Sequence, residues 1–277
     1  MGLPTSPAGS AWDRVYVVGA GPGAPDLITL RGQRLLAEAD RVVYAGSLVN
    51  PAVLAHARPD AETVDSAELA LPEIVGQMVS GFRAGLRVVR LHSGDPSIYG
   101  ALTEQLRELE RENVPWEVVP GVPSAMAAAA ALGVEYTLPE VAQSVIFTRM
   151  EGRTPVPERE KLAALAAHGT TLVLFLSVQM IHKVVPELLR EYPPETPVAV
   201  VYKASWPEQK IVRGTLEDIV PRVREAGIRA TALIVVGRVL DGGALPDAEF
   251  HASRLYDPTF SHGFRRALGS RSEGTAP

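Results

Sequence analysis

The sequence predicts an α/β fold built from two α/β domains. Short apolar runs of strand length alternate with segments of helical periodicity almost throughout the chain, and glycine-bearing loops follow several of these runs. This alternation is typical of sheets covered by helices, and a helix between successive strands favours parallel pairing. At 277 residues the chain is long enough for two domains that each bury a core.

The first half of the chain predicts a largely parallel sheet. Its apolar runs have the length of strands, and the stretches between them carry apolar residues at helical spacing. Strands are expected at residues 15–18, 42–44, 87–91 and 116–119, and helices at residues 29–38, 72–84 and 97–112. These elements make up the expected N-terminal domain, residues 14–119, which follows a disordered leader of residues 1–13.

The second half, residues 120–240, predicts a domain with a mixed sheet. Strands are expected at residues 171–176, 198–202, 210–213 and 232–236, and helices at residues 124–132, 161–167, 179–191 and 216–225. The run "SVIFTR" follows the first of these helices. Thr215 is the expected N-cap of the last helix. The turn residues "WPEQ" between two strands predict a hairpin, which makes the sheet mixed. The tail, residues 241–277, is expected to be partly disordered.

Composition excludes several classes of protein. Apolar residues make up 46% and charged residues 21% of the chain, and no apolar stretch approaches the roughly 18 residues of a membrane span. The absence of cysteine rules out disulfides, thiolate metal sites and cysteine catalysis, and it fits a reducing cytoplasm. A formal net charge of −5 without clustered Lys and Arg argues against nucleic acid, and the first residues lack a secretion signal.

The first glycine loop, "GAGPGAP", follows the strand at residues 15–18. Its spacing matches G-x-G-x-x-A, which is typical of dinucleotide-binding loops. However, Pro22 and Pro25 remove N–H groups that a pyrophosphate needs, and Asp40 precedes the second strand instead of following it. A loop that approaches another kind of ligand with its backbone is favoured, and a loop that only turns the chain is the alternative.

Two further loops follow strands of the same predicted sheet. "LHSGDPSIYG" carries Asp95, which can form an Asx turn or face a ligand, and His92, for which a structural role is favoured. "VPGVPSA" leads into the alanine-rich helix. Because the carboxyl ends of parallel strands meet at one edge of a sheet, the three loops are expected to converge on one ligand crevice.

Basic residues in the second half suggest anion binding. Arg149 and Arg153 lie in "FTRMEGRTPVP", where they can bind carboxylates or form only surface ion pairs. "VYKASWPEQK" adds Lys203 and Trp206, which can line a pocket or simply pack the hairpin. No metal-binding histidine spacing, Ser-His-Asp order or P-loop is present, so these residues predict a crevice ligand without identifying a reaction.

Together the motifs resemble the tetrapyrrole methylases, the S-adenosylmethionine (SAM)-dependent enzymes of cobalamin and sirohaem synthesis. The stretches that carry the resemblance are "VGAGPGAPDLITLRG", "YAGSLV", "RLHSGDPSIYG", "VPGVPS", "TLPE" and "ASWPEQKIVRGTL", in the family's order. "TRMEGRTPVPERE", "LAAHGTTLVLFLSV" and "SRLYDPTFSHGFR" are most similar to the branch that methylates C11 of precorrin-4 or cobalt-precorrin-4.

The resemblance implies a cytoplasmic homodimer with SAM bound in a cleft between the two domains, mainly by backbone groups, and S-adenosylhomocysteine (SAH) as product. A ring carbon of the tetrapyrrole would accept the methyl group directly, without a covalent enzyme intermediate. No resident metal, membrane or nucleic acid is expected.

The resemblance also marks individual positions. Those that match the family's cofactor contacts are Pro22, Gly94, Asp95, Ile98, Pro123, Ser124, Ala125, Leu176, Ala204 and Ala232. Substrate contacts are expected from Gly21, Gly23, Arg31, Arg149, Arg153 and Lys203. Asp95 is the expected catalytic residue, with a positioning role in place of proton transfer.

Three alternatives stay open. The chain can be another SAM-dependent methylase, acting on a different precorrin or on uroporphyrinogen III. The others are a dinucleotide-dependent oxidoreductase and a tetrapyrrole-binding protein without activity.

Overall fold

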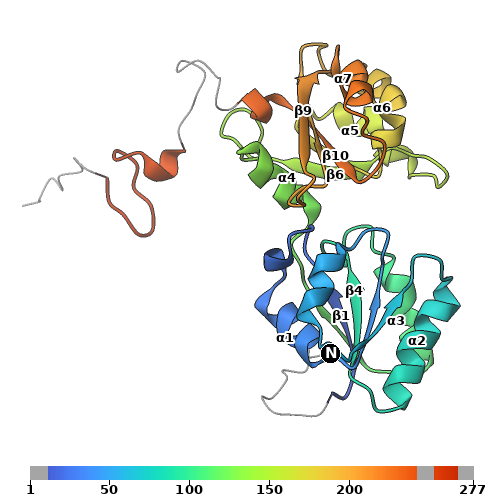
Figure 1. Cartoon of the computed structure of the whole chain (residues 1–277). Helices are drawn as coiled ribbons and strands as arrows, with labels where there is room; N and C mark the ends of the chain where they lie inside the picture. Colours follow the sequence, from blue (N-terminus) through green and yellow to red (C-terminus); the bar gives the residue numbers. More distant parts are fainter. Residues whose placement is uncertain (1–11, 242–252, 268–277) are drawn as a thin grey trace, which may run out of the picture. The chain divides into compact units, whose positions relative to one another are not determined.

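The computed structural model describes residues 12–241 and 253–267. Its contacts divide the chain into two compact units (Figure 1). The first runs to Leu132 and also takes in Val201–Ile211 and Ile228–Leu233, and the second holds the remaining residues. The helix at residues 124–132 thus clusters with the first unit, whereas the expected boundary precedes it. Most of the expected leader and much of the expected tail lie outside the described residues.

A parallel sheet forms the centre of the first unit. Its strands are β1 (Val15–Gly19), β2 (Arg41–Tyr44), β3 (Glu62–Asp65), β4 (Val88–His92) and β5 (Trp116–Val119). The order is β3-β2-β4-β1-β5 and every neighbouring pair is parallel, as predicted. β3 is absent from the prediction because its sequence, "ETVD", is a largely exposed edge strand without an apolar run.

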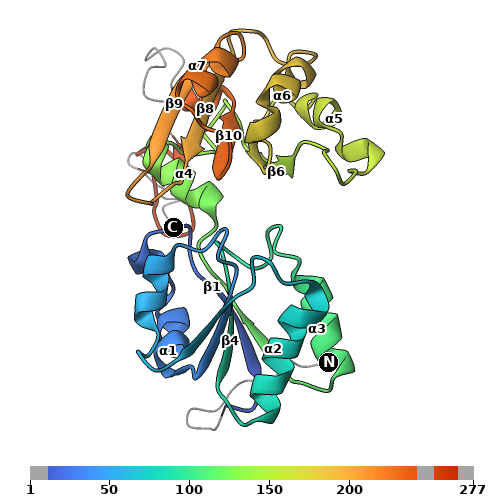
Figure 2. The ribbon, with the colours of Figure 1, turned by 45° about the vertical axis from the view of Figure 1, so that its right-hand side comes forward.

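Helices cover both faces of this sheet. They are α1 (Leu30–Glu38), α2 (Leu71–Arg83) and α3 (Leu102–Arg111). The first unit also contains α4 (Ser124–Leu132), which follows β5 along the chain. Figure 2 shows α1 on one face of the sheet and α2 and α3 on the other. Accordingly Leu36 of α1 and Met78 of α2 belong to two separate apolar cores. Two short 3₁₀ helices, Pro25–Leu27 and Pro51–His56, lie in the connections.

The helix expected at residues 97–112 begins only at Leu102, so its predicted start is wrong. Tyr99 and Ala101 have φ angles of 53° and 47°. This left-handed backbone cannot continue into a right-handed helix, and Asp95 forms a turn just before it. The loop after β4 is therefore longer than the sequence predicts.

The second sheet is mixed, as predicted. Its strands are β6 (Val145–Arg149), β7 (Thr171–Phe175), β8 (Pro197–Tyr202), β9 (Lys210–Thr215) and β10 (Ala232–Val236). The order is β6-β7-β10-β8-β9, with β6 parallel and β10 antiparallel to β7.

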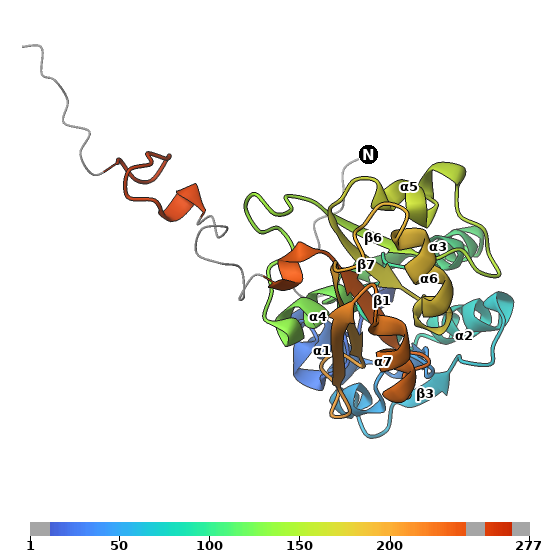
Figure 3. The same cartoon turned by 90° about the horizontal axis from the view of Figure 1, so that it is seen from above.

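The helices of the second unit are α5 (Leu162–Ala166), α6 (Ile181–Leu188) and α7 (Ile219–Glu225), and α6 lies between the other two (Figure 3). Short 3₁₀ helices span Glu158–Glu160, Val178–Met180, Arg238–Asp241 and Arg254–Tyr256. The predicted N-cap Thr215 is wrong, because α7 begins at Ile219 after Asp218. Asp218 Oδ1 accepts a hydrogen bond from the backbone N–H of Thr215 at 2.8 Å, which closes a turn before the helix.

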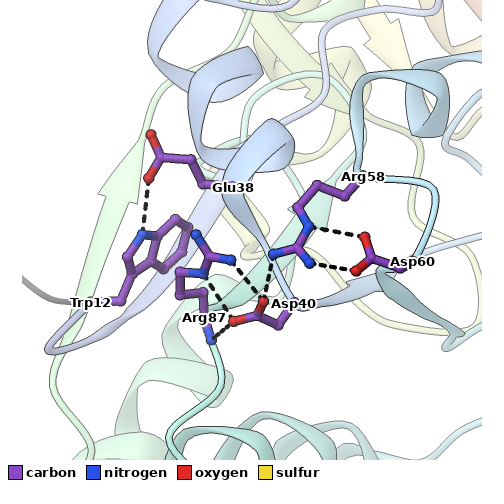
Figure 4. Close-up of polar contacts among 6 residues, drawn as sticks. All are labelled: Trp12, Glu38, Asp40, Arg58, Asp60 and Arg87. Atoms are coloured by element: carbon purple, nitrogen blue, oxygen red, sulfur yellow. Dashed lines mark hydrogen bonds and ion pairs between the residues drawn. The ribbon is translucent and has the colours of Figure 1, made fainter.

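A charged cluster joins the amino ends of β2 and β4 (Figure 4). Asp40 accepts hydrogen bonds from Arg87 N at 2.8 Å, Arg87 Nε at 2.9 Å and Arg58 Nη1 at 2.9 Å. Arg87 thereby holds the pKa of Asp40 well below its usual range. Asp40 is thus a structural group at the sheet edge opposite the glycine loops, which is no place for a ribose-binding carboxylate.

Within the described residues, no helix combines the length and the apolar character needed to cross a membrane.

Candidate functional site

The loops that follow β1, β4 and β5 are hydrogen-bonded to one another, as the sequence predicts. The backbone N–H of Gly21 donates to Gly94 O at 3.2 Å, and Gly94 N–H donates to Gly21 O at 2.8 Å. The third loop joins through Gly121, whose N–H donates to Asp95 Oδ2 at 2.9 Å. Three segments far apart in the sequence therefore form one framework at the carboxyl edge of the first sheet.

Glycines allow these loops to touch backbone to backbone. A Cβ atom on Gly19 would lie 2.6 Å from Gly121 Cα, and one on Gly121 would lie 2.1 Å from Gly94 O. Both distances are far shorter than any real carbon contact, so a larger residue would push the loops apart. The glycine spacing thus serves packing between loops and is not by itself a dinucleotide signature.

Asp95 uses one carboxylate oxygen within its own loop and the other to join the third loop. Oδ1 accepts hydrogen bonds from the backbone N–H of Ser97 at 2.9 Å and from its hydroxyl, and Oδ2 accepts from Gly121. Burial alone would raise the pKa of Asp95, but the hydrogen bonds from Ser97 and Gly121 hold it below its usual value. The predicted Asx turn is confirmed, and a carboxylate so placed suits a positioning role.

The loop between β8 and β9 contacts the first glycine loop. Trp206 Nε1 donates to Pro22 O at 3.0 Å, and the backbone N–H of Ala24 donates to Ser205 Oγ at 3.0 Å. On the same glycine loop, the amide of buried Asn50 donates to Gly23 O at 2.9 Å. The segment Pro22–Ala24 is therefore held by side chains from two directions.

Nearly all predicted cofactor residues lie in the first unit, and Leu176 is the exception. Gly94 faces the third loop, since a Cβ on it would lie 3.5 Å from Pro123 Cα and 3.7 Å from Ser124 N. Ala204 and Ala232 are buried, and the neighbouring Lys203 N–H donates to Thr231 O at 2.9 Å. These positions combine small side chains with closely spaced backbone. The resemblance expects SAM to be held mainly by backbone groups, and contact of these residues with SAM stays a prediction.

In the second unit, Arg149 and Leu176 lie at the ends of two neighbouring strands. Arg149 pairs with Phe175 across β6 and β7, so Leu176 follows directly beside it. Leu176 is 64% exposed and has a φ of 53°, a left-handed conformation that is strained for a leucine. Leu176 thus has the exposure that a ligand contact requires.

The predicted substrate-binding cations differ in the hydrogen bonds and ion pairs that they form within the protein. Arg149 donates to Thr154 O at 3.2 Å and to Pro155 O at 2.9 Å, which stiffens its loop. Arg31 forms an ion pair with Glu117, and Lys203 Nζ lies 3.7 Å from Glu208 Oε1. Arg153 is exposed. Their contacts with substrate stay a prediction.

Sequence reasoning missed a buried polar group behind the second loop. Arg90 is 4% exposed and donates to Gln105 Oε1 at 2.9 Å and Ser66 Oγ at 2.9 Å. His92 beside it is also buried, and burial together with the charge of Arg90 lowers its pKa to about 4. In the sequence, the charged residue within the apolar run "VVRLH" could have indicated a buried arginine. His92 is therefore a neutral, structural histidine at pH 7.

Among the described residues, no three side chains of the types that bind metals lie close enough together to hold an ion.

Comparisons with known proteins agree with this geometry. The sequence pattern of the family described as Tetrapyrrole (Corrin/Porphyrin) Methylases matches residues 14–220. A cobalt-precorrin-4 C(11)-methyltransferase of Methanocaldococcus jannaschii is 53% identical over 256 residues, which cover 92% of this chain and 96% of the relative. A precorrin-4 C(11)-methyltransferase of Pseudomonas aeruginosa is 49% identical over 247 residues, which cover 88% and 98%.

Solved structures are similar as well. The X-ray structure of a cobalt precorrin-4 methyltransferase, described as a cobalamin biosynthetic enzyme, has a TM-score of 0.80 at 51% identity and covers 82% of this chain and 96% of its own. A uroporphyrin-III C-methyltransferase from Thermus thermophilus, complexed with S-adenosylhomocysteine, has a TM-score of 0.69 at 35% identity and covers 82% and 93%. This chain belongs to the tetrapyrrole (corrin/porphyrin) methylases and is a SAM-dependent methyltransferase.

Proposed function

We propose that this chain transfers the methyl group of SAM to C11 of precorrin-4 or cobalt-precorrin-4, giving precorrin-5 or its cobalt form in cobalamin biosynthesis. One observation carries the proposal: relatives with this activity in their names match the chain at about half of all positions over nearly its full length. The uroporphyrin-III enzyme is less similar, at 35% identity.

In this proposal the protein positions the reactants and SAM supplies the reactive group. SAM supplies an activated methyl group, so the protein needs no nucleophile and no obligatory base. The three glycine loops provide rigid backbone with small side chains around Pro22, Gly94 and Pro123. Asp95 fixes its own loop through Ser97 and joins it to the third loop through Gly121. Rigid placement of the reacting groups is itself a large contribution to rate.

Substrate binding needs local positive charge, because a precorrin carries several carboxylates and the chain has a net charge of −5. We assign this role to Arg149 and Arg153, with Arg31 and Lys203 as further contacts. Arg31 and Lys203 each have a carboxylate partner, which a substrate carboxylate can replace. A homodimer, a cytoplasmic location and a cleft between the two domains remain predictions of the sequence.

The test is turnover by the full chain. The protein is incubated with SAM and, in separate reactions, precorrin-4, cobalt-precorrin-4 and uroporphyrinogen III, and the products are analysed by mass spectrometry. We expect the mass of one methyl group on precorrin-4 or its cobalt form, an equal amount of SAH, and no product without SAM. Methylation of uroporphyrinogen III alone would overturn the proposal.

A further inference from the structure

The loop between β8 and β9 fills the space beside Gly23. A Cβ atom on Gly23 would lie 2.0 Å from Trp206 Cδ1 and 2.1 Å from Trp206 Nε1. The indole therefore packs directly on the backbone of the first glycine loop, in addition to its hydrogen bond to Pro22 O. Any shift of Trp206 must move Pro22 and Gly23, because no side chain lies between them to absorb it.

The segment that carries Trp206 adopts a strained conformation. Lys203 and Ser205 have φ angles of 45° and 70°. The strain is held by local contacts: Trp206 N–H donates to Lys203 O at 2.9 Å, and Ser205 N–H donates to Gln209 Oε1 at 2.8 Å. Strained residues of this kind persist only where their surroundings hold them, and they concentrate at binding sites.

The cation of Lys203 adds to the rigidity of the indole. Its Nζ lies 4.6 Å from the centre of the Trp206 ring, within the range of a cation–π contact. Trp206 is thus restrained on its face by Lys203 and at its edge by Pro22 O.

We infer that Trp206 is a positioning residue for methyl transfer, whose indole holds Pro22–Ala24 in the conformation that accepts SAM. Gly21, the residue just before Pro22–Ala24, is hydrogen-bonded to Gly94, so the second loop also fixes the chain that enters this segment. The inference rests on the proposed function, and it names a residue that affects SAM binding through the first glycine loop.

The test is Trp206→Phe, which keeps an aromatic ring but removes the N–H donor. We expect the Kd of SAH and the KM for SAM to rise about tenfold, the effect of one lost hydrogen bond. The kcat stays within about twofold of wild type, since the reacting groups are untouched once SAM is bound. Trp116→Phe is the matched control, because Trp116 is a partly buried tryptophan that packs against α2 and α3. We expect this variant to bind SAH with wild-type affinity.

Ser205→Ala is the second variant, in case Trp206→Phe fails to fold. It removes the acceptor for Ala24 N–H and is also expected to weaken SAH binding. Wild-type SAH affinity in both folded variants overturns the inference, and so does a loss of kcat with unchanged KM and Kd. If the wild-type chain itself binds no SAH, the proposed function fails instead, which separates the two results.

Discussion

Gly121→Ala tests the backbone packing of the glycine loops. The added Cβ would lie 2.1 Å from Gly94 O and 2.8 Å from Gly19 Cα, and both atoms belong to backbone that cannot rotate away. A carbon and a carbonyl oxygen rest at about 3.3 Å or more, so the loops must separate by about 1 Å. Gly121 does not have a positive φ, so the cost comes from the clash and not from backbone strain.

The expected loss of stability is about 3 kcal/mol. Overpacking typically costs about 1–3 kcal/mol. The separation also weakens the hydrogen bond from Gly121 to Asp95, at about 1 kcal/mol. Urea unfolding followed by tryptophan fluorescence measures the free energy of unfolding, and titration calorimetry measures the Kd of SAH. The Kd should rise at least about tenfold, because Gly94 and Asp95 are displaced together.

Gly76→Ala is the matched control, because Gly76 is exposed on α2 and a Cβ there meets nothing within 4 Å. It should stabilise the protein by up to about 1 kcal/mol and leave SAH binding unchanged. A Gly121→Ala protein within about 0.5 kcal/mol of wild type, with wild-type SAH affinity, would refute the reasoning.

Three further substitutions address single side chains. Asp95→Asn places an amide donor against either Ser97 or Gly121 and should weaken SAH binding about tenfold without shifting the pH profile of kcat. A shifted pH profile of kcat would instead make Asp95 an acid or base. Burial lowers the pKa of His92 to about 4 in the folded protein, below its unfolded value. Its contribution to the free energy of unfolding is therefore complete above about pH 6.5 and falls by about 2 kcal/mol by pH 5. His92→Gln should remove this part of the pH dependence of urea unfolding, and an unchanged slope would contradict the assignment. Asp40→Asn should lower the free energy of unfolding by about 1–3 kcal/mol at pH 7 without changing SAH affinity. Because the pKa of Asp40 is lowered in the folded protein, its contribution to stability is present at pH 7 and is lost only as pH falls below about 3.9. Weaker SAH binding in Asp40→Asn would show that this cluster is not purely structural.

Much of the first sheet could be predicted because its signals are local. Apolar runs such as "VYVV" mark strands, and glycine and proline mark the loops after them. Parallel strands then place those loops at one edge, which is why Gly21, Gly94 and Gly121 were expected near one another. Residue-level cofactor positions came from the family resemblance and not from periodicity.

Other features had no local signal. Trp206 and Pro22 are separated by 184 residues, and nothing in either stretch indicates that the indole meets that carbonyl. The buried position of Arg90 depends on Gln105 and Ser66, which arrive from other elements. The shortened helix start at Leu102 follows from the left-handed backbone at Ala101, a residue type that rarely adopts it.

The central claim is that methyl transfer from SAM occurs at C11 of a precorrin. Turnover with SAM carrying an isotope-labelled methyl group, followed by nuclear magnetic resonance of the purified product, locates that methyl directly. The account predicts one labelled methyl, bonded to C11. A label on any other ring carbon would contradict it, and so would binding of SAH without any labelled product from either precorrin-4 or cobalt-precorrin-4.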